Sequence, residues 1–130
     1  MPDEPVCAAV VVHAGRLLLV RRRVPEGSLV WQLPAGKAEA GEVVTATAVR
    51  ETFEETGLVV EPVIALGERV HPLTQRRIVY VACRVVSGVA HVADAHEIVQ
   101  VVWAVPAEWS ELVPHGFAST VQDYLADLIG

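Results

Sequence analysis

The sequence has little of several residue types on which whole classes of protein depend. Its 130 residues include 2 cysteines, Cys7 and Cys83, and both lie in valine-rich runs. That setting favours buried free thiols over a disulfide scaffold and predicts a reducing, cytoplasmic location. No apolar run approaches the ~20 residues of a membrane-spanning helix, and the first residues are acidic where a secretory signal carries basic charge. We therefore expect neither a membrane partner nor secretion.

Basic residues are also scarce. The chain has Lys+Arg 10 against Asp+Glu 16, for a formal net charge of -6, and Lys37 is its only lysine. Proteins that bind DNA or RNA draw most of their affinity from clustered lysine and arginine, so we expect no nucleic-acid partner. A small phosphorylated ligand remains compatible with this charge, because a bound divalent cation reverses the local charge of an acidic site.

Length and composition predict one compact domain over residues 1–130. This length is close to the commonest domain size of about 100–150 residues, and no repeat, low-complexity tract or linker interrupts the sequence. The chain contains 26 valines. Because β-branched side chains fit the pleated surface of a sheet better than a helix, we expect a sheet-rich core.

Turn residues and hydrophobic periodicity predict the order of helices and strands. Gly57 is expected to end an internal helix as a left-handed C-cap, and Ser119 or Thr120 to begin a C-terminal amphipathic helix as its N-cap. The expected order predicts an α/β sandwich with a helix on each face of a mixed sheet. The expected elements are a hairpin of residues 6–12 and 16–22, a loop at 24–28, a strand at 29–33, a glycine-bearing loop, a helix at 43–56, strands at 58–66, 77–86 and 99–105, and the C-terminal helix.

Three acids crowd the last two turns of the internal helix: Glu51, Glu54 and Glu55. The helix dipole disfavours negative charge there, and Glu51 and Glu55 form a like-charge pair at i, i+4. Helical periodicity predicts that a stripe of Ala46, Val49 and Phe53 packs while the opposite face carries the carboxylates. A solvated charged face is one interpretation. The other is a site for Mg²⁺, which prefers oxygen ligands.

The segment before this helix favours the second interpretation. Residues 33–42 form a glycine-bearing loop whose backbone is able to approach a ligand closely. Arg50 stands four residues before Glu54, so it is able to pair either with that carboxylate or with Glu42. Such pairing would fix the geometry of the acidic cluster.

The segment from Gly36 to Leu58 resembles the Nudix box, the signature of the Nudix (MutT-like) hydrolases. Gly36, five residues, Glu42, seven residues and then Arg50-Glu51-Thr52-Phe53-Glu54-Glu55-Thr56-Gly57-Leu58 match its spacing. Thr52 departs from the pattern, which has a bulky aliphatic residue there. The preceding hairpin, residues 31–34, and Glu97 followed by residues 102–103 also suit the family's layout, so the resemblance extends over the whole chain.

The resemblance implies a Nudix-type α/β/α sandwich and a defined set of site residues. Glu51, Glu54, Glu55 and the carbonyl of Ala35 would bind Mg²⁺ or Mn²⁺, which would polarise the pyrophosphate and lower the pKa of an attacking water. Arg50 and Glu42 would orient the site, with Gly36 and Gly57 as structural residues of the motif. Glu97 would be a metal ligand or the general base, or else a solvated loop acid. Glu54 and Glu51 are the alternative bases.

Substrate contacts are expected outside the acidic cluster. Arg22 and Arg23 resemble family positions that contact substrate phosphate, although an arginine at a strand exit is often only solvated. Lys37 and Tyr80 are further substrate-binding candidates. Trp31, like Tyr80, would either stack on a nucleobase or belong to the core. The pair at residues 76–77 would either reach the phosphates or protect a sheet edge, and the histidines have no metal-ligand spacing.

The resemblance implies hydrolysis of a nucleoside diphosphate linked to a group X. We expect a small-molecule nucleotide substrate, in the first place a nucleoside triphosphate cleaved to monophosphate and pyrophosphate. ADP-ribose or a nucleotide sugar is the alternative substrate, and a non-catalytic nucleotide sensor is the alternative function. A homodimer through an edge strand or the C-terminal helix is a further possibility.

Overall fold

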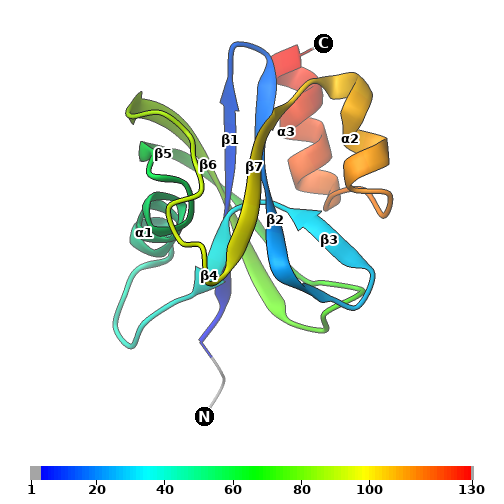
Figure 1. Ribbon diagram of the computed structural model, residues 1–130. Helices are drawn as coiled ribbons and strands as arrows, with labels where there is room; N and C mark the ends of the chain where they lie inside the picture. The colour runs from blue at the N-terminus through cyan, green and yellow to red at the C-terminus, as the bar shows by residue number, and fades with distance from the viewer. Residues whose placement is uncertain (1–3, 130) are drawn as a thin grey trace.

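The fold is a mixed sheet between helices (Figure 1). The structure, a computed structural model, describes residues 4–129. Its elements, in chain order, are β1 (Val6–His13), β2 (Arg16–Glu26), β3 (Leu29–Gln32), β4 (Ala35–Lys37), α1 (Val44–Thr56), β5 (Val59–Val70), β6 (Arg77–Ser87), β7 (Ile98–Ala104), α2 (Pro106–Leu112) and α3 (Ser119–Ile129).

The sheet opens between its two central strands. β1 and β2 pair only beside their tight turn, at Val12↔Leu17 and His13↔Arg16, where Ala14 and Gly15 both have positive φ. Away from the turn, β1 pairs with β6 in parallel and with β4 in antiparallel orientation, whereas β2 pairs with β3 and β7. The segment from β3 to β4 crosses between the separating strands (Figure 1). The cavity described below lies there.

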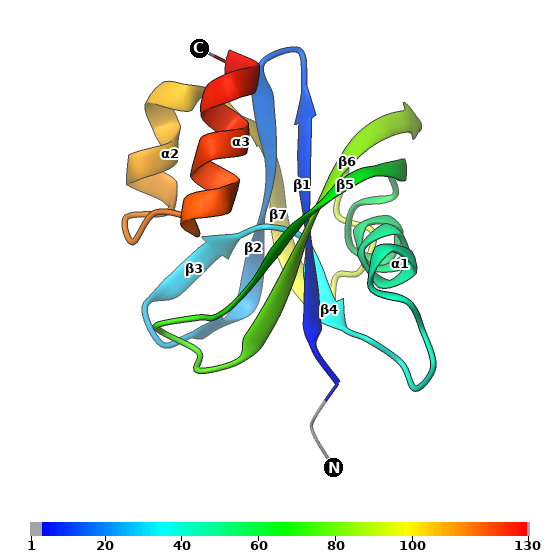
Figure 2. The same ribbon diagram turned by 180° about the vertical axis from the view of Figure 1, so that it is seen from behind.

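Both faces of the central strands are buried, which explains their continuous apolar sequences. Successive side chains of a strand point to opposite faces. Ala8 and Val10 therefore belong to the core under α2 and α3, together with Val121 and Leu125 of α3, whereas Cys7, Ala9 and Val11 belong to the core under α1. Figure 2 shows α1 on one side of the sheet and the α2–α3 pair on the other. The predicted sandwich with helices on both faces is confirmed.

Most predicted elements are present, but the predicted loop at residues 24–28 is wrong. β2 continues to Glu26, which pairs with Leu29 beyond a bulge, and only the turn at Gly27 separates β2 from β3. The pairing partner supplies the hydrogen bonds that make this polar segment a strand. β5 is also longer than expected and reaches Val70, because β6 pairs with it along its length.

Two short elements were not predicted. β4 was expected to be part of a loop, and it is a strand only because its residues pair with Val6, Cys7 and Ala8 of β1. α2 has local signals of a helix start, with proline at its first position and the Glu108 carboxylate accepting from the Val105 N–H at 2.9 Å. The last helix begins earlier than expected: Ser119, one of the two expected N-caps, is already helical, and the Ala118 carbonyl accepts from the Gln122 N–H.

The buried face of α1 differs from the predicted one. Ala46 and Phe53 were expected to pack, but both are exposed, Phe53 by 54%. The face against the sheet instead consists of small side chains and one acid: Thr47, Ala48, Thr52, Glu55 and Thr56. Small residues let the helix approach the sheet closely, and the Thr52 and Thr56 hydroxyls donate to helix carbonyls four residues earlier, each at 2.7 Å. This orientation turns Glu55 inward.

The two cysteines are free and buried, as predicted. Among residues 4–129, none of the helices combines the length and the apolar character needed to span a bilayer.

The end of α1 depends on Gly57, which caps the helix at φ 75° and donates its N–H to Phe53 O at 2.9 Å. A Cβ at Gly57 would also overlap the His91 ring, whereas one at Gly41, with φ 78°, would meet nothing. We predict that Gly41→Ala lowers the free energy of unfolding by about 1–2 kcal/mol, the cost of the left-handed conformation, and that Gly57→Ala lowers it further. Urea denaturation measures both.

A His91→Ala background serves as the control for this prediction. It should bring the cost of Gly57→Ala down to that of Gly41→Ala, because the ring that the new Cβ overlaps is gone. Equal costs for the two alanines in the original sequence would contradict the predicted overlap.

Candidate active site

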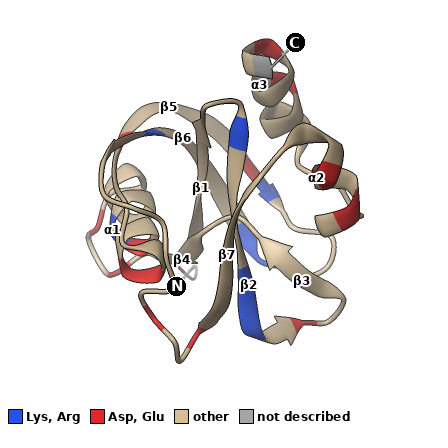
Figure 3. Cartoon of the chain, turned by 45° about the horizontal axis from the view of Figure 1, so that its top comes forward, with Lys and Arg blue, Asp and Glu red and all other residues tan. Residues whose placement is uncertain are grey.

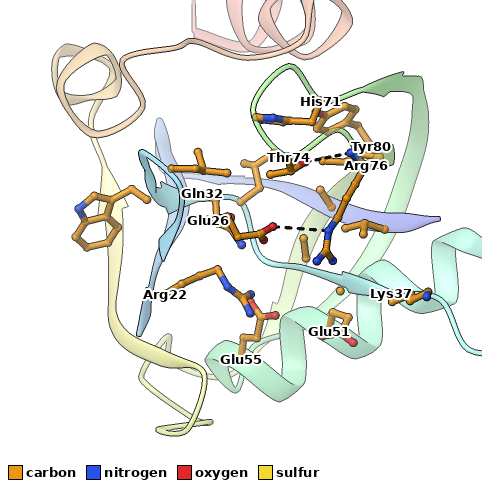
Figure 4. A pocket seen from close by; sticks show the side chains of 18 of the residues that line it. Arg22, Glu26, Gln32, Lys37, Glu51, Glu55, His71, Thr74, Arg76 and Tyr80 are labelled. Carbon is orange, nitrogen blue, oxygen red and sulfur yellow. Dashed lines mark hydrogen bonds and ion pairs between the residues drawn. The ribbon is translucent and has the colours of Figure 1, made fainter. Parts of the chain in front are cut away.

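A cavity of about 310 Å³ opens where β1 and β2 separate (Figure 4). α1 and β4 form one end, which is acidic, and β5, β6 and the turn between them form the other. Figure 3 shows the acidic residues of α1 and the basic stretch of β2 at the same end of the molecule. The charged residues that line the cavity are Arg22, Glu26, Lys37, Glu51, Glu54, Glu55, Arg69, Arg76, Asp94 and Glu97.

Arg50 holds the acidic segment together, as the spacing predicted. Its Nε and Nη2 bind the two carboxylate oxygens of Glu42 at 2.8 and 2.9 Å, and its Nη1 binds Glu51 at 2.9 Å and Glu54 at 3.1 Å. Nη2 also donates to the Lys37 carbonyl at 3.3 Å. The expected alternatives, Glu42 or Glu54, are therefore both partners. One side chain fixes the loop and the helix relative to each other.

Glu42 is the firmest partner of Arg50. It also accepts from the Thr47 hydroxyl at 2.7 Å and from the Glu39 N–H at 3.1 Å. These hydrogen bonds, that of Arg50 first, lower the pKa of Glu42 to about 2. Glu42 in turn raises the pKa of Arg50 above its ordinary value. The pair therefore stays ionised through the range in which carboxyl groups usually titrate.

Glu55 is in the opposite situation. It is 3% exposed, and its Oε1 has no hydrogen-bond partner. Burial, followed by the neighbouring Glu51 charge, raises the pKa of Glu55 to about 9, against smaller lowering effects of Arg22 and the Ala35 backbone. Burial and the Glu54 charge also raise the pKa of Glu51. The negative charge of Glu51 and Glu55 is therefore only partly compensated by the neighbouring arginines.

Gly36 provides the space in which Glu51 lies. A Cβ at Gly36 would overlap the Glu51 carboxylate, so only glycine permits the strand β4 to pass this close to the helix. Ala35, its neighbour, lines the cavity beside the same acids. The expected roles of Gly36 and Gly57 as structural residues thus have a steric basis.

Glu97 and Arg22 form an ion pair in the wall of the cavity. Arg22 Nη2 lies 2.7 Å from Glu97 Oε2, and both residues line the cavity. Figure 4 shows Arg22 directed toward Glu55. Arg23 lies elsewhere: its Nε donates to the Ala95 carbonyl at 3.0 Å, and it does not line the cavity. Of the two arginines expected at substrate, the structure brings only Arg22 to the acids.

Of the other residues expected to contact substrate, some lie in the cavity wall and some belong largely to the hydrophobic core. Lys37 is exposed and lines the cavity next to Gly36. Tyr80 also lines it but is 4% exposed, and its hydroxyl accepts from Arg69 Nε at 3.2 Å, so most of the ring belongs to the core. Trp31 is partly buried and lines the cavity while packing against the core under α3.

The far end of the cavity contains residues that the sequence did not single out as a group. Glu26, Arg69, His71 and Thr74 line it, together with Arg76. Burial and the Arg69 charge lower the pKa of His71, whose Nδ1 accepts from the Leu73 N–H at 3.1 Å. Only Arg76 had a sequence signal, as one of two adjacent arginines after a proline turn.

The donor set at the acidic end fits a hard divalent cation. As the side chains stand, no group of three or more His, Cys, Asp or Glu residues within 4–129 is placed to hold a metal ion, since Arg50 draws Glu51 and Glu54 to itself. The unpartnered Glu55 oxygen, the neighbouring Glu51 and the nearby Ala35 are nevertheless oxygen ligands on adjacent elements. Carboxylate and carbonyl oxygens are the ligands that Mg²⁺ and Mn²⁺ prefer.

A family model and the sequences of known proteins match this chain. The family model described as NUDIX domain matches residues 3–126. The phosphatase NudJ of Escherichia coli (strain K12) is 42% identical over 57 residues, which are 44% of this chain and 37% of NudJ. The chain thus aligns with little more than a third of that relative.

Solved structures share the fold over nearly the whole chain. A NUDIX hydrolase from Nitrosomonas europaea has a TM-score of 0.75 at 23% identity, over 98% of this chain and 88% of that one. An Ap4A hydrolase from C. elegans has a TM-score of 0.75 at 18% identity, over 95% and 97% of the two chains.

The raised pKa of Glu55 predicts how stability depends on pH without metal. The pKa is about 9 in the folded protein against 4.5 as the ordinary value, so the unfolded chain loses its proton first and stability falls as the pH rises between these values. Glu55→Gln removes this effect. In EDTA, its melting temperature should exceed that of the original protein at pH 8, and the difference should shrink toward pH 4.5.

Glu54→Gln is the matched control, because Glu54 lies one residue away but is exposed. It should not reproduce the pH-dependent gain. A Glu55→Gln protein that melts at or below the original temperature at pH 8 would contradict the assignment of Glu55 as a buried, only partly compensated acid.

Proposed function

This chain belongs to the Nudix family, and on that premise we propose that it is a divalent-metal-dependent hydrolase of nucleoside diphosphate derivatives. The substrate we propose first is a nucleoside triphosphate, cleaved to monophosphate and pyrophosphate. The observation that carries the proposal is the buried carboxyl of Glu55, whose Oε1 has no hydrogen-bond partner and which lies beside Glu51 in the wall of a cavity that also contains Arg22. Such a group destabilises the metal-free fold, and a bound cation would compensate it.

The metal would be held by Glu51, Glu54, Glu55 and the carbonyl of Ala35. When bound, Mg²⁺ or Mn²⁺ supplies Lewis-acid polarisation of the pyrophosphate and lowers the pKa of the attacking water. The chain's own contribution is to keep these oxygen ligands on rigid elements. Arg50 and Glu42 do this by fixing the β4–α1 loop against the helix through the bidentate pair at 2.8 and 2.9 Å.

Two residues are candidates for the general base. Glu54 is half-exposed to the cavity and shares Arg50 Nη1 with Glu51, and Glu97 has one oxygen engaged by Arg22 at 2.7 Å. Glu51 is less suited, since its carboxylate is enclosed against Gly36. If Glu97→Gln loses kcat while its metal affinity, measured by calorimetry, is unchanged, Glu97 is the base; if Glu97→Gln retains kcat, the base is Glu54.

The size of the cavity agrees with a small nucleotide substrate. Its volume of about 310 Å³ lies at the low end of the roughly 300–1,000 Å³ that small-molecule sites span. ADP-ribose or a nucleotide sugar remains the alternative substrate. Arg22 and Lys37 would meet the phosphates on either side of the acids. Because both cysteines are free and buried, we assign the enzyme to a reducing compartment, the cytoplasm.

A nucleotide sensor without catalysis is the less favoured function. A protein that only binds nucleotide gains nothing from three acids at a helix C-terminus, where the dipole opposes them. All three acids line the cavity.

The test is a panel of nucleoside triphosphates, ADP-ribose and nucleotide sugars with Mg²⁺ or Mn²⁺, in which the released nucleoside monophosphate is measured, together with pyrophosphate for the triphosphates. We predict turnover of at least one nucleoside triphosphate, no turnover in EDTA, and a loss of about 100-fold or more in kcat for Glu54→Gln, since that substitution removes either a metal ligand or the base. Failure to hydrolyse any compound of the panel would refute the proposal. Undiminished turnover by Glu54→Gln would refute the assignment of the acids.

Gly36→Ala tests the geometry of the acidic end without removing an acid. The new Cβ would overlap the Glu51 carboxylate and displace it, and a displacement of about 1 Å costs up to about 100-fold in rate. We therefore predict a loss of kcat of about that size, measured at saturating Mg²⁺. Gly41→Ala, in the loop that follows β4 and with open space around it, is the control and should retain activity.

A further inference from the structure

The turn between β5 and β6 is built to hold one conformation. The Arg76 carbonyl accepts from His71 N–H at 2.8 Å, and the His71 carbonyl accepts from Gln75 N–H at 2.9 Å, which closes residues 71–76 into a compact loop. Inside it, His71 Nδ1 accepts from the Leu73 N–H at 3.1 Å, and the Thr74 hydroxyl accepts from the Arg76 N–H at 3.3 Å.

One residue of the turn adopts a conformation that side chains other than glycine seldom take. Gln75 has φ 61°, and its side-chain amide donates to the Pro72 carbonyl at 3.0 Å. His71, at the base of the turn, is 8% exposed. The buried His71 and the positive φ of Gln75 together fix the direction in which the chain leaves the turn. They therefore fix the position of the Arg76 backbone.

Arg76 extends from this turn into the cavity. Figure 4 shows its side chain directed from the turn toward the end that contains Glu51 and Glu55, with Glu26 beside it. Its Nε lies 3.7 Å from Glu26 Oε2, a long separation for an ion pair. The guanidinium is thus positioned over the acidic end by a weak contact that a competing anion is able to replace.

The neighbouring arginine behaves differently. Arg77 Nη1 lies 2.8 Å from Glu68 Oε2, across the β5–β6 pair, and Arg77 does not line the cavity. The two side chains are similarly exposed, 59% for Arg76 and 46% for Arg77. Of these two adjacent cations, Arg77 therefore pairs with an acid of the neighbouring strand β5, and Arg76 faces the cavity.

The other two arginines near the acidic end have shorter ion pairs. Arg50 is fully engaged by three glutamates, with contacts of 2.8–3.1 Å, and Arg22 is paired with Glu97 at 2.7 Å. Arg76 is the cation of the cavity wall whose carboxylate partner is both distant and half-exposed, since Glu26 has a 33% exposed side chain. It is the arginine best able to exchange its partner for a phosphate.

We propose that Arg76 is a substrate-binding residue, which the 71–76 turn presents to the phosphate chain of the nucleotide and which exchanges Glu26 for phosphate when substrate binds. This inference rests on the proposed function and adds a contact that lies outside the Nudix box. A planar guanidinium with free Nη groups suits two phosphate oxygens at once.

The test compares Arg76→Gln with Arg77→Gln, the adjacent arginine outside the cavity. The probes are a non-hydrolysable nucleoside triphosphate analogue and inorganic tripolyphosphate, each with Mg²⁺, and titration calorimetry measures Kd. We expect Arg76→Gln to weaken both probes by about 10- to 100-fold, the usual range for a hydrogen-bonded charge, and Arg77→Gln to change Kd by no more than about twofold. Arg76→Lys should recover part of the loss.

Two outcomes would overturn the proposal. If Arg76→Gln binds both probes as Arg77→Gln does, Arg76 does not contact the substrate. If only the nucleotide analogue is weakened, Arg76 contacts the nucleoside and not the phosphates. Both outcomes are distinct from failure of the proposed function, in which the original protein hydrolyses no nucleotide. Circular-dichroism melting of the two variants confirms that each is folded.

Discussion

The site depends above all on the contacts of one guanidinium with three carboxylates. Arg50 binds Glu42 through two parallel hydrogen bonds and reaches Glu51 and Glu54 with its remaining Nη1. This planar donor restrains the loop and the helix relative to each other, because it binds Glu42 of the loop and two acids of α1 at once. Without it, acids so close together would repel one another along the helix. The same contacts compete with any metal for Glu51 and Glu54.

The second residue on which the site depends is Glu55. It lies on the face of α1 that packs against the sheet, where its Oε1 has no hydrogen-bond partner and the nearby Arg22 charge offsets only part of the cost of burial. A buried carboxyl of this kind is unfavourable for folding, and its presence is understandable when a ligand makes use of it. The threonines and alanine around it let α1 approach the sheet closely. The face of α1 that packs in the core is therefore also the face that carries an acid of the site. The site lies where β1 and β2 separate and the sheet gives access to this face.

Several features could be predicted because their signals lie within a few residues. The turn at residues 13–15, the Gly57 cap and the spacing of Arg50, Glu54 and Glu55 are local, and the structure contains each of them. The predicted packing stripe through Phe53 failed because periodicity alone did not reveal that the small, partly polar face packs. β4 is a strand only through its pairing with β1, and the 24–28 segment is mostly strand only through its pairing with β3.

The sequence by itself therefore determined the family, the acidic helix and the acids that we propose as metal ligands, since all of these follow from residue identity at short spacing. Only the tertiary structure decided which acid is buried, which of two adjacent arginines enters the cavity, and that Arg22 rather than Arg23 faces the acids. The physical reason is that burial and ion pairing depend on neighbours far away in the chain. Glu97 is 75 residues from Arg22, and Glu26 meets Arg76 only because two distant turns lie beside the same cavity.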